Sequence, residues 1–316
     1  MHSYFLPVGL IFAFLFAWVF PESGQWLEQQ GLIPWMVVII FLINGYKTRL
    51  HQITGDVSLI KTVILAILIN LLISPFLGLA VVSLLHIPSE LALGLLVIST
   101  VPATLSSCVV ITQIAGGSAP KALILTILLN IIGVFSIPFI LELILEQMSL
   151  ISLSPWPLLQ QLLLIILLPF VIGILSRSIF QHPGSQWLLA YLPSICVIGT
   201  VWLSMSASTE TLGQLNLPLL LWIILASISI HGGLMLLCWL SRLLHPSERG
   251  EWLALLFTAS QKTLPVAVGV LTALEQPAGL ALLACILFHF QQLFIDSILA
   301  SWLEKRFVLS SDSYQS

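Results

Sequence analysis

The chain has 316 residues, of which 59% are hydrophobic and only 7% are charged. A soluble globular protein could not cover its surface with so few charged side chains. The net charge is −3 and no basic block is present, which excludes the positive surface that nucleic-acid binding requires. The composition therefore predicts an all-α membrane protein whose surroundings are the lipid bilayer.

Polar breaks divide the chain into ten apolar runs that are candidates for transmembrane helices, each of which needs about 20 residues. The runs cover roughly 4–20, 32–46, 58–84, 90–114, 119–146, 157–178, 185–206, 216–244, 250–274 and 277–304.

The distribution of Lys and Arg gives an orientation to these runs. Cytoplasmic loops retain positive charge, whereas exported loops are depleted of it. Nine of the ten Lys and Arg residues flank the even-numbered breaks or follow the last run, and the odd-numbered breaks contain none. We therefore expect a multi-pass protein of the plasma (cytoplasmic) membrane with both termini cytoplasmic. The remaining basic residue, Lys262, lies inside the ninth run.

A short repeat relates the two halves of the chain. The tripeptide Pro-Ser-Glu opens both the fourth run, at 88–90, and the ninth, at 246–248. By the charge distribution, the first copy is external and the second is cytoplasmic. This predicts two inverted five-helix repeats, 1–148 and 149–306, followed by a cytoplasmic tail at 307–316. Inverted repeats are typical of secondary transporters.

Both of these runs carry a polar, proline-containing midpoint. Thr104 and Lys262 have the same offset from the two tripeptides, and each is surrounded by hydroxyl residues and a proline. Interrupted helices at matched positions of inverted repeats point to a binding site at mid-membrane. The alternative is two ordinary proline kinks filled by small residues for close packing.

Lys262 is the strongest single signal, because it lies about 18 Å along the helix from either end of its run. An ammonium at that depth costs at least ~2.5 kcal/mol, so it needs a partner or a water-filled cavity. Asp296 is the one acid well inside a run, towards the expected cytoplasmic end of the tenth. Two interpretations stay open for it: a structural one, which is pairing with Lys305 or Arg306 or local capping, and a role in the site.

Other polar residues inside the runs are more typical of hydrogen bonds between helices than of ligands. Asn130 and His289 stand out, because they follow Pro120 and Pro277 by similar distances and should face the two midpoints. The full set is Asn70, Asn130, His231, His289, Gln291 and Gln292.

Two segments carry a family resemblance, namely VPATLSSCVVITQIAGGSAPKALILT at 101–126 and FTASQKTLPVAVGVL at 257–271. They resemble the bile acid:sodium symporter superfamily, in particular the branch that includes the seventh member of solute carrier family ten and its bacterial relatives, and the resemblance extends over nearly the whole chain. It implies ten helices in two inverted repeats, with broken helices four and nine crossing at mid-membrane. It also implies a panel domain from spans 1, 2, 6 and 7, a core domain from spans 3–5 and 8–10, and transport of a small organic anion by alternating access.

Sodium-coupled members of that family bind the ion through side chains of spans four, five and nine. The resemblance makes Ser107, Thr126 and Gln261 the candidate sodium ligands, and sodium the one cofactor to consider. Cys108 stands in place of the family's asparagine, and Phe257 or a neighbour in place of its span-nine glutamate. Sodium prefers several oxygen ligands and usually a carboxylate, so this departure argues against sodium coupling.

Lys262 then has two interpretations. Its ammonium replaces the sodium ion, with the nitrogen among the three candidate ligands and Ser106, or it faces the solute cavity and binds an anionic group together with helix N-termini. The candidate substrate- and ion-binding residues are Thr104, Ser106, Ser107, Thr126, Asn130, Gln261, Lys262, Thr263 and His289.

Transport is the function that these patterns favour, and two alternatives remain. The first is a regulatory membrane protein that uses the transporter scaffold without transporting. The second is an intramembrane enzyme with His231, His289 and Asp296 as acid–base groups. We expect no enzyme, because no nucleophile motif or paired aspartates accompany these three residues.

Overall fold

The computed structural model describes residues 2–48, 59–148, 153–179, 186–207, 209, 216–274 and 279–312, and within these ranges the regular structure is helical, without strands. The helices are α1 (His2–Val19), α2 (Pro21–Gln29), α3 (Leu32–Lys47), α4 (Leu59–Ile67), η2 (Leu68–Ile73), α5 (Ser74–Leu84), α6 (Ser89–Thr100), α7 (Ser107–Ile114), α8 (Ala119–Gln147), α9 (Pro155–Leu162), η3 (Leu163–Leu167), α10 (Leu168–Ile179), α11 (Gln186–Ala207), α13 (Leu217–Leu244), α14 (Arg249–Ser260), α15 (Leu264–Ala273) and α16 (Gly279–Asp312). The segments η2 and η3 are π-helical turns.

Seven helical segments of the described chain are long and apolar enough to cross a membrane. They correspond to the third and to the fifth to tenth of the expected runs. The segments are Leu59–Leu84, Ala119–Gln147, Pro155–Arg177, Leu189–Ala207, Leu217–Leu243, Arg249–Ala273 and Gly279–Lys305.

The other three expected runs have a different form. The first forms α1 and then bends by 100° into α2, a helix that the sequence did not predict. Pro21 stands in the first turn of α2, where the missing amide of proline costs no hydrogen bond. The second run is α3, of 16 residues, and the fourth is divided into α6 and α7. The last run also continues beyond its expected end, because α16 extends to Asp312.

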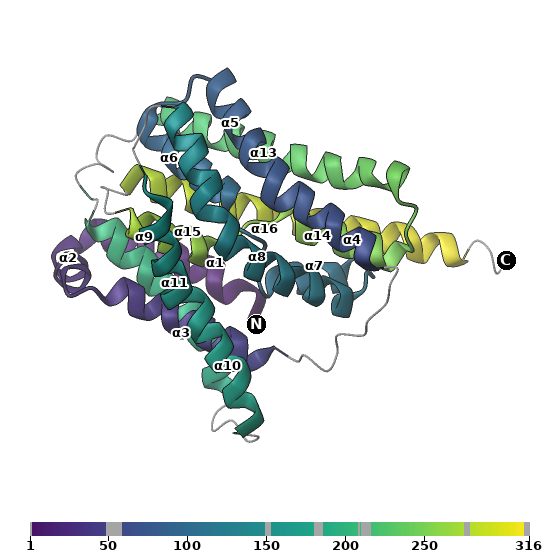
Figure 1. The fold of residues 1–316 in the computed structure, drawn as a ribbon, viewed down its shortest axis with the longest axis horizontal. Coiled ribbons are helices and arrows are strands. Elements are labelled where there is room, and N and C mark those ends of the chain that lie inside the picture. The colour runs from purple at the N-terminus through teal and green to yellow at the C-terminus, as the bar shows by residue number, and fades with distance from the viewer. Residues whose placement is uncertain are drawn as a thin grey trace.

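The helices pack in two groups that meet along α3, α11, α15 and α16. The helices α1, α3, α10 and α11 pack on one another, with α3, α10 and α11 at the lower left of Figure 1. The other group contains α4 to α8, α13, α14 and α16. Helix α15 contacts α3 and α11 of the first group as well as α6 and α16 of the second.

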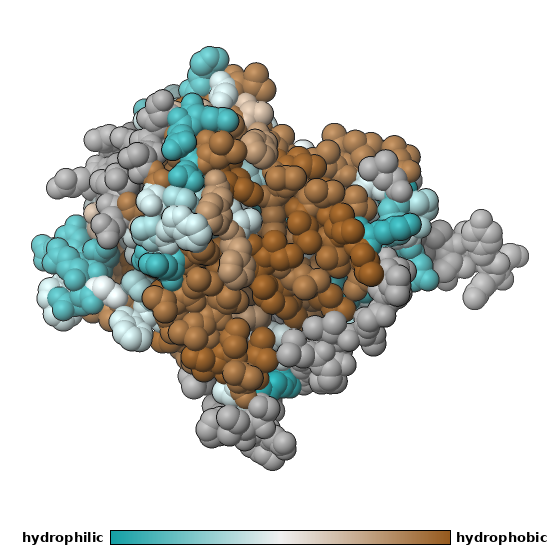
Figure 2. Space-filling model, in the orientation of Figure 1, coloured by the Kyte–Doolittle hydropathy of each residue, from teal (hydrophilic) through white to brown (hydrophobic). Residues whose placement is uncertain are grey.

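The face seen in Figure 2 is apolar over a broad area, with hydrophilic residues at its edges and in a patch left of its centre. Large hydrophobic side chains such as Phe12, Leu84 and Leu243 are exposed. An apolar surface of this extent is unusual for a soluble monomer and suits contact with lipid. Helix α14 is the opposite case, since every residue from Glu251 to Ser260 is buried.

Candidate functional site

Two non-helical segments meet in the interior. Helix α6 ends at Thr100 and α7 begins at Ser107, while α14 ends at Ser260 and α15 begins at Leu264. We call residues 101–106 the first break and residues 261–263 the second break. The amide of Thr263 donates to the carbonyl of Pro102 at 2.9 Å, so the two breaks are in direct contact.

Side chains from neighbouring helices bind the carbonyl groups that these breaks leave without helical partners. This matters because an unpaired backbone group inside a membrane costs several kcal/mol. In the first break, Val101 accepts from Lys262 Nζ at 3.0 Å and Ala103 from Asn130 Nδ2 at 2.9 Å. Around the second break, Ala259 and Gln261 accept from Asn70 Nδ2 at 2.9 and 3.0 Å, Ser260 lies 3.3 Å from His231 Nδ1, and Lys262 accepts from Gln292 Nε2 at 2.6 Å.

Lys262 is fully buried, and its nitrogen is not where the cation-replacement interpretation put it. Instead of bonding to Ser107, Thr126 or Gln261, Nζ donates to two backbone carbonyls, Asn70 at 2.6 Å and Val101 at 3.0 Å. The expected position is therefore wrong. The ammonium joins the π-helical turn η2 to the first break.

The local structure of η2 explains why the carbonyl of Asn70 can accept this bond. In an α-helix it would accept from the amide of Ser74, but that amide donates to Ile69 instead. The next residue, Pro75, has no amide hydrogen to offer. The π-helical turn and the proline together leave one carbonyl directed at Lys262.

A second chain of buried side chains begins at the first break. Thr104 Oγ1 donates to Gln261 Oε1 at 2.7 Å, and Ser107 Oγ lies 2.5 Å from that hydroxyl and 3.1 Å from Gln261 Oε1. Gln261 Nε2 donates to Asp296 Oδ2 at 2.6 Å, and Asp296 Oδ1 lies 3.0 Å from His231 Nε2. Asp296 thus pairs inside the protein with Gln261 and His231, which corrects the alternative that placed it with the basic residues at the end of its helix.

The three expected sodium ligands bond to other side chains in this arrangement. Ser107 and Gln261 bond to each other, and Thr126 Oγ1 lies 3.0 Å from the thiol of Cys108. Phe257 is fully buried and supplies no carboxylate. Asp296 accepts from the side-chain nitrogen of Gln261, so its carboxylate is not placed beside the side-chain oxygen of Gln261. A donor set without a carboxylate, whose amide oxygen already accepts a hydrogen bond, fits sodium poorly.

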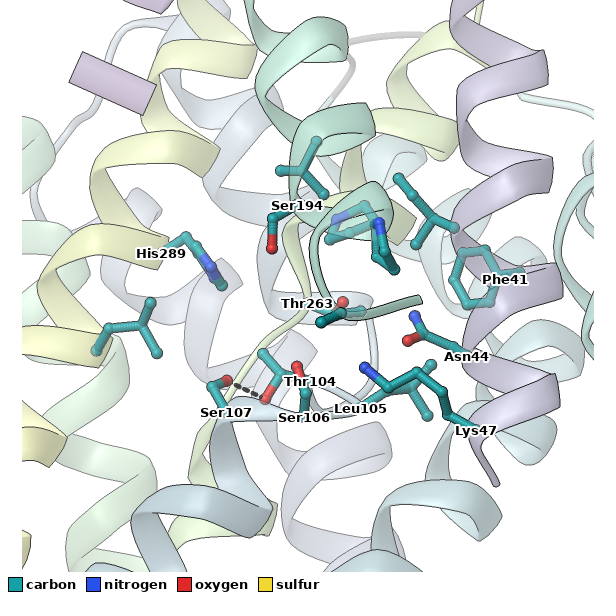
Figure 3. A pocket seen from close by; sticks show the side chains of 16 residues that line it. Phe41, Asn44, Lys47, Thr104, Leu105, Ser106, Ser107, Ser194, Thr263 and His289 are labelled. Carbon is teal, nitrogen blue, oxygen red and sulfur yellow. Dashed lines mark hydrogen bonds between the residues drawn. The ribbon is translucent and has the colours of Figure 1, made fainter. Parts of the chain in front are cut away.

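A cavity of about 130 Å³ lies beside the two breaks. Its walls come from α3, α11, α16 and both breaks (Figure 3). Five of the nine candidate residues line it, namely Thr104, Ser106, Ser107, Thr263 and His289. The other four are not among its lining residues: Asn130 and Lys262 donate to carbonyls of the first break, Gln261 accepts from Thr104, and Thr126 Oγ1 lies 3.0 Å from the thiol of Cys108.

The cavity also contains polar residues that the sequence did not mark as part of a site. Asn44 and Lys47 come from one face of α3, and Ser194 comes from α11. The signal in the sequence was the spacing of Asn44 and Lys47, because residues three apart share a helix face. A lysine at the end of an apolar run is, however, the usual mark of a membrane boundary.

Comparisons with known proteins agree with the helical, membrane-spanning character of the chain. Residues 4–305 match the SBF-like CPA transporter family. The chain is 27% identical to "Probable sodium/metabolite cotransporter BASS4, chloroplastic" of Oryza sativa subsp. indica, over 96% of this chain and 76% of that protein. It is 28% identical to the protein of that name in Arabidopsis thaliana, over 95% and 73%.

A third relative comes from the branch that the sequence segments resembled. The chain is 24% identical to "Sodium/bile acid cotransporter 7" of Rattus norvegicus, over 95% of this chain and 93% of that protein. The resemblance to the bile acid:sodium symporters is thereby confirmed. Because the family match covers nearly the whole chain, this multi-pass membrane protein belongs to the SBF-like CPA transporter family.

Proposed function

We propose that this protein is a secondary active transporter that moves a small organic anion by alternating access. One observation carries the proposal: the cavity lies between the two groups of helices, with α3 and α11 on one side and both breaks on the other. A solute bound there would contact both groups. Movement of one group against the other would then open the cavity to alternate faces of the membrane.

The architecture that we propose has ten spans in two inverted repeats. Spans four and nine are the pairs α6–α7 and α14–α15, which cross at their breaks. Spans 1, 2, 6 and 7 are α1, α3, the α9–η3–α10 segment and α11, and they form the panel domain. The remaining spans form the core domain. The location is the plasma membrane, with both termini cytoplasmic, although the plant relatives are named as chloroplastic.

We further propose that transport does not depend on sodium, even though the relatives are named as sodium cotransporters. Support comes from the donor set. Phe257 brings no carboxylate, and the oxygen of Gln261 already accepts from Thr104. Thr104, Ser107 and Gln261 bond to one another without a cation, whereas the side-chain oxygens of Asn70, Asn130 and Thr258 are buried without a hydrogen-bond partner in the described part of the chain.

The test is uptake of radiolabelled organic anions into proteoliposomes, with sodium on both sides replaced by choline. The panel contains short hydroxy monocarboxylates, dicarboxylates and sulfonates, and empty liposomes set the background. We expect accumulation of at least one class, at a rate that changes less than twofold without sodium. Strict sodium dependence would overturn the proposed sodium independence but not the transport function. Failure of the whole panel would favour the non-transporting, regulatory alternative.

A further inference from the structure

Lys47 is the one residue among the sixteen that line the cavity whose side chain has a fixed positive charge, and none of the sixteen is acidic. It ends α3, one turn after Asn44, which lines the same wall. Figure 3 shows the nitrogen of Lys47 directed across the cavity towards Ser106 and Thr104. The charge lies where a solute would bind.

The ammonium of Lys47 has no hydrogen bond or ion pair within the described residues, whereas Lys121 forms a salt bridge with Glu251 at 2.5 Å. Most lysines at the end of an apolar helix extend towards lipid headgroups or bulk water. Lys47 is exposed, and it also lines a cavity with hydroxyl groups from both breaks. A site that combines one cation with hydroxyl and amide donors recognises an anion.

Two further features of the cavity walls favour the binding of an anion. The N-termini of α7 and α15 lie at the cavity, because Ser106 and Thr263 directly precede these helices. Neither residue caps its helix through a side-chain hydrogen bond, so both hydroxyls are available to a solute. The positive ends of the helix dipoles add to the attraction for an anion but do not by themselves define a site.

We propose that Lys47 binds the anionic group of the transported solute and sets the preference for monoanions. The inference rests on the proposed transport function and identifies the chemical class of solute as a small monocarboxylate. Its carboxylate lies between Lys47 and the hydroxyl of Ser106, and its apolar part faces Phe41 and Val197. One cationic side chain balances one negative charge, so a dianion of similar size gains less.

The position of Lys47 also gives it a mechanical role. It belongs to α3, whereas Ser106 and Thr263 belong to the breaks. A carboxylate held between Lys47 and Ser106 joins the two groups of helices. Solute binding would thus be felt by both groups, as alternating access requires.

The experiment compares wild type, Lys47→Gln, Lys47→Arg and Lys61→Gln in proteoliposomes. Lys61 is the matched control, because it is exposed on α4, outside the cavity, and is assigned to the same membrane face by the charge distribution. The probes are lactate and 2-hydroxybutyrate, with lactamide as a neutral analogue and malate as a dianion. Size-exclusion profiles establish that each variant is folded.

We expect Lys47→Gln to raise KM for lactate at least about tenfold with little change in the maximal rate, and to leave the weak response to lactamide unchanged. Lys47→Arg should stay within a few-fold of wild type, and Lys61→Gln should match it. An unchanged KM in Lys47→Gln, or an equal effect in Lys61→Gln, would overturn the role of Lys47 while leaving the transport function standing.

A binding measurement decides the case in which wild type takes up none of the probes. Purified protein is unfolded thermally with and without lactate. Stabilisation of wild type and Lys47→Arg that is lost in Lys47→Gln supports the anion site although transport fails. Equal behaviour of wild type and Lys47→Gln would overturn it.

Discussion

Lys262 Nζ donates to backbone carbonyls rather than to an acid. Asn70 and Val101 each offer one carbonyl, from two different spans, and neither carbonyl has a helical partner of its own. Such a residue is costly to remove, because its loss leaves two buried acceptors unpaired.

We therefore expect Lys262→Met, which keeps the length of the side chain but not its donors, to lower the free energy of unfolding by roughly 2 to 5 kcal/mol. Thermal unfolding of the detergent-purified protein measures this. Lys61→Met, at an exposed position, should change stability by less than about 0.5 kcal/mol. Equal stability of the two variants would show that the carbonyls find other partners.

The sequence predicted that Lys262 needs a partner, but it could not identify one. A backbone carbonyl has no side-chain signature, and Asn70 is 192 residues away along the chain. The prediction accordingly turned to the polar side chains that resemble the family's sodium ligands. Lys47 was missed for the reverse reason, since its position at the end of an apolar run has an ordinary explanation and its place in a cavity follows only from how α3 packs.

At the scale of elements, the turn η2 and Pro75 prepare the site that receives Lys262. The π-helical turn takes the amide of Ser74 away from Asn70, and Pro75 supplies no hydrogen in its place. The π-helical turn of this span therefore provides the acceptor for the side chain of Lys262, which belongs to another span.

Replacing Pro75 tests this coupling. Pro75→Ala provides an amide that can donate to the carbonyl of Asn70. We expect Lys262→Met to cost at least about 1 kcal/mol less in the Pro75→Ala background than in wild type, measured as a double-mutant cycle of unfolding free energies. Strictly additive costs would mean that the carbonyl of Asn70 stays unpaired in both backgrounds.

Element boundaries followed the sequence at the two Pro-Ser-Glu tripeptides, although neither helix there has a side-chain cap, and they departed from the sequence at the π-helical turns and at α2. The Pro-Ser-Glu tripeptides precede or open α6 and α14 much as expected. The π-helical turns were not predicted, because one extra residue in a turn leaves the apolar pattern nearly unchanged. The helix α2 was read as a polar break, since its composition is that of a loop.

For the whole molecule, the distribution of Lys and Arg predicts which ends of the spans face the cytoplasm. All four native cysteines are buried, so an introduced cysteine can be labelled against a low background. We expect Ser154→Cys to react with a membrane-impermeant maleimide from outside the cell, and Glu248→Cys to react only after the membrane is opened. Both positions are exposed. The reverse pattern would invert the proposed topology.

The buried partners of Lys262 constrain the order in which the chain can be completed during synthesis. In the segment Arg249–Ala273, 94% of an 18-residue apolar window is buried inside the protein, so the segment gains little from contact with lipid. The ribosome makes the carbonyls at Asn70 and Val101 long before it makes Lys262, and until then they lack their donor. We expect residues 1–148 expressed alone to be degraded, and co-expression with residues 149–316 to protect them, as pulse-chase labelling would show. Lys262 would then act as a checkpoint of biogenesis, by which a half-made protein remains recognisable to quality-control proteases until its second half arrives.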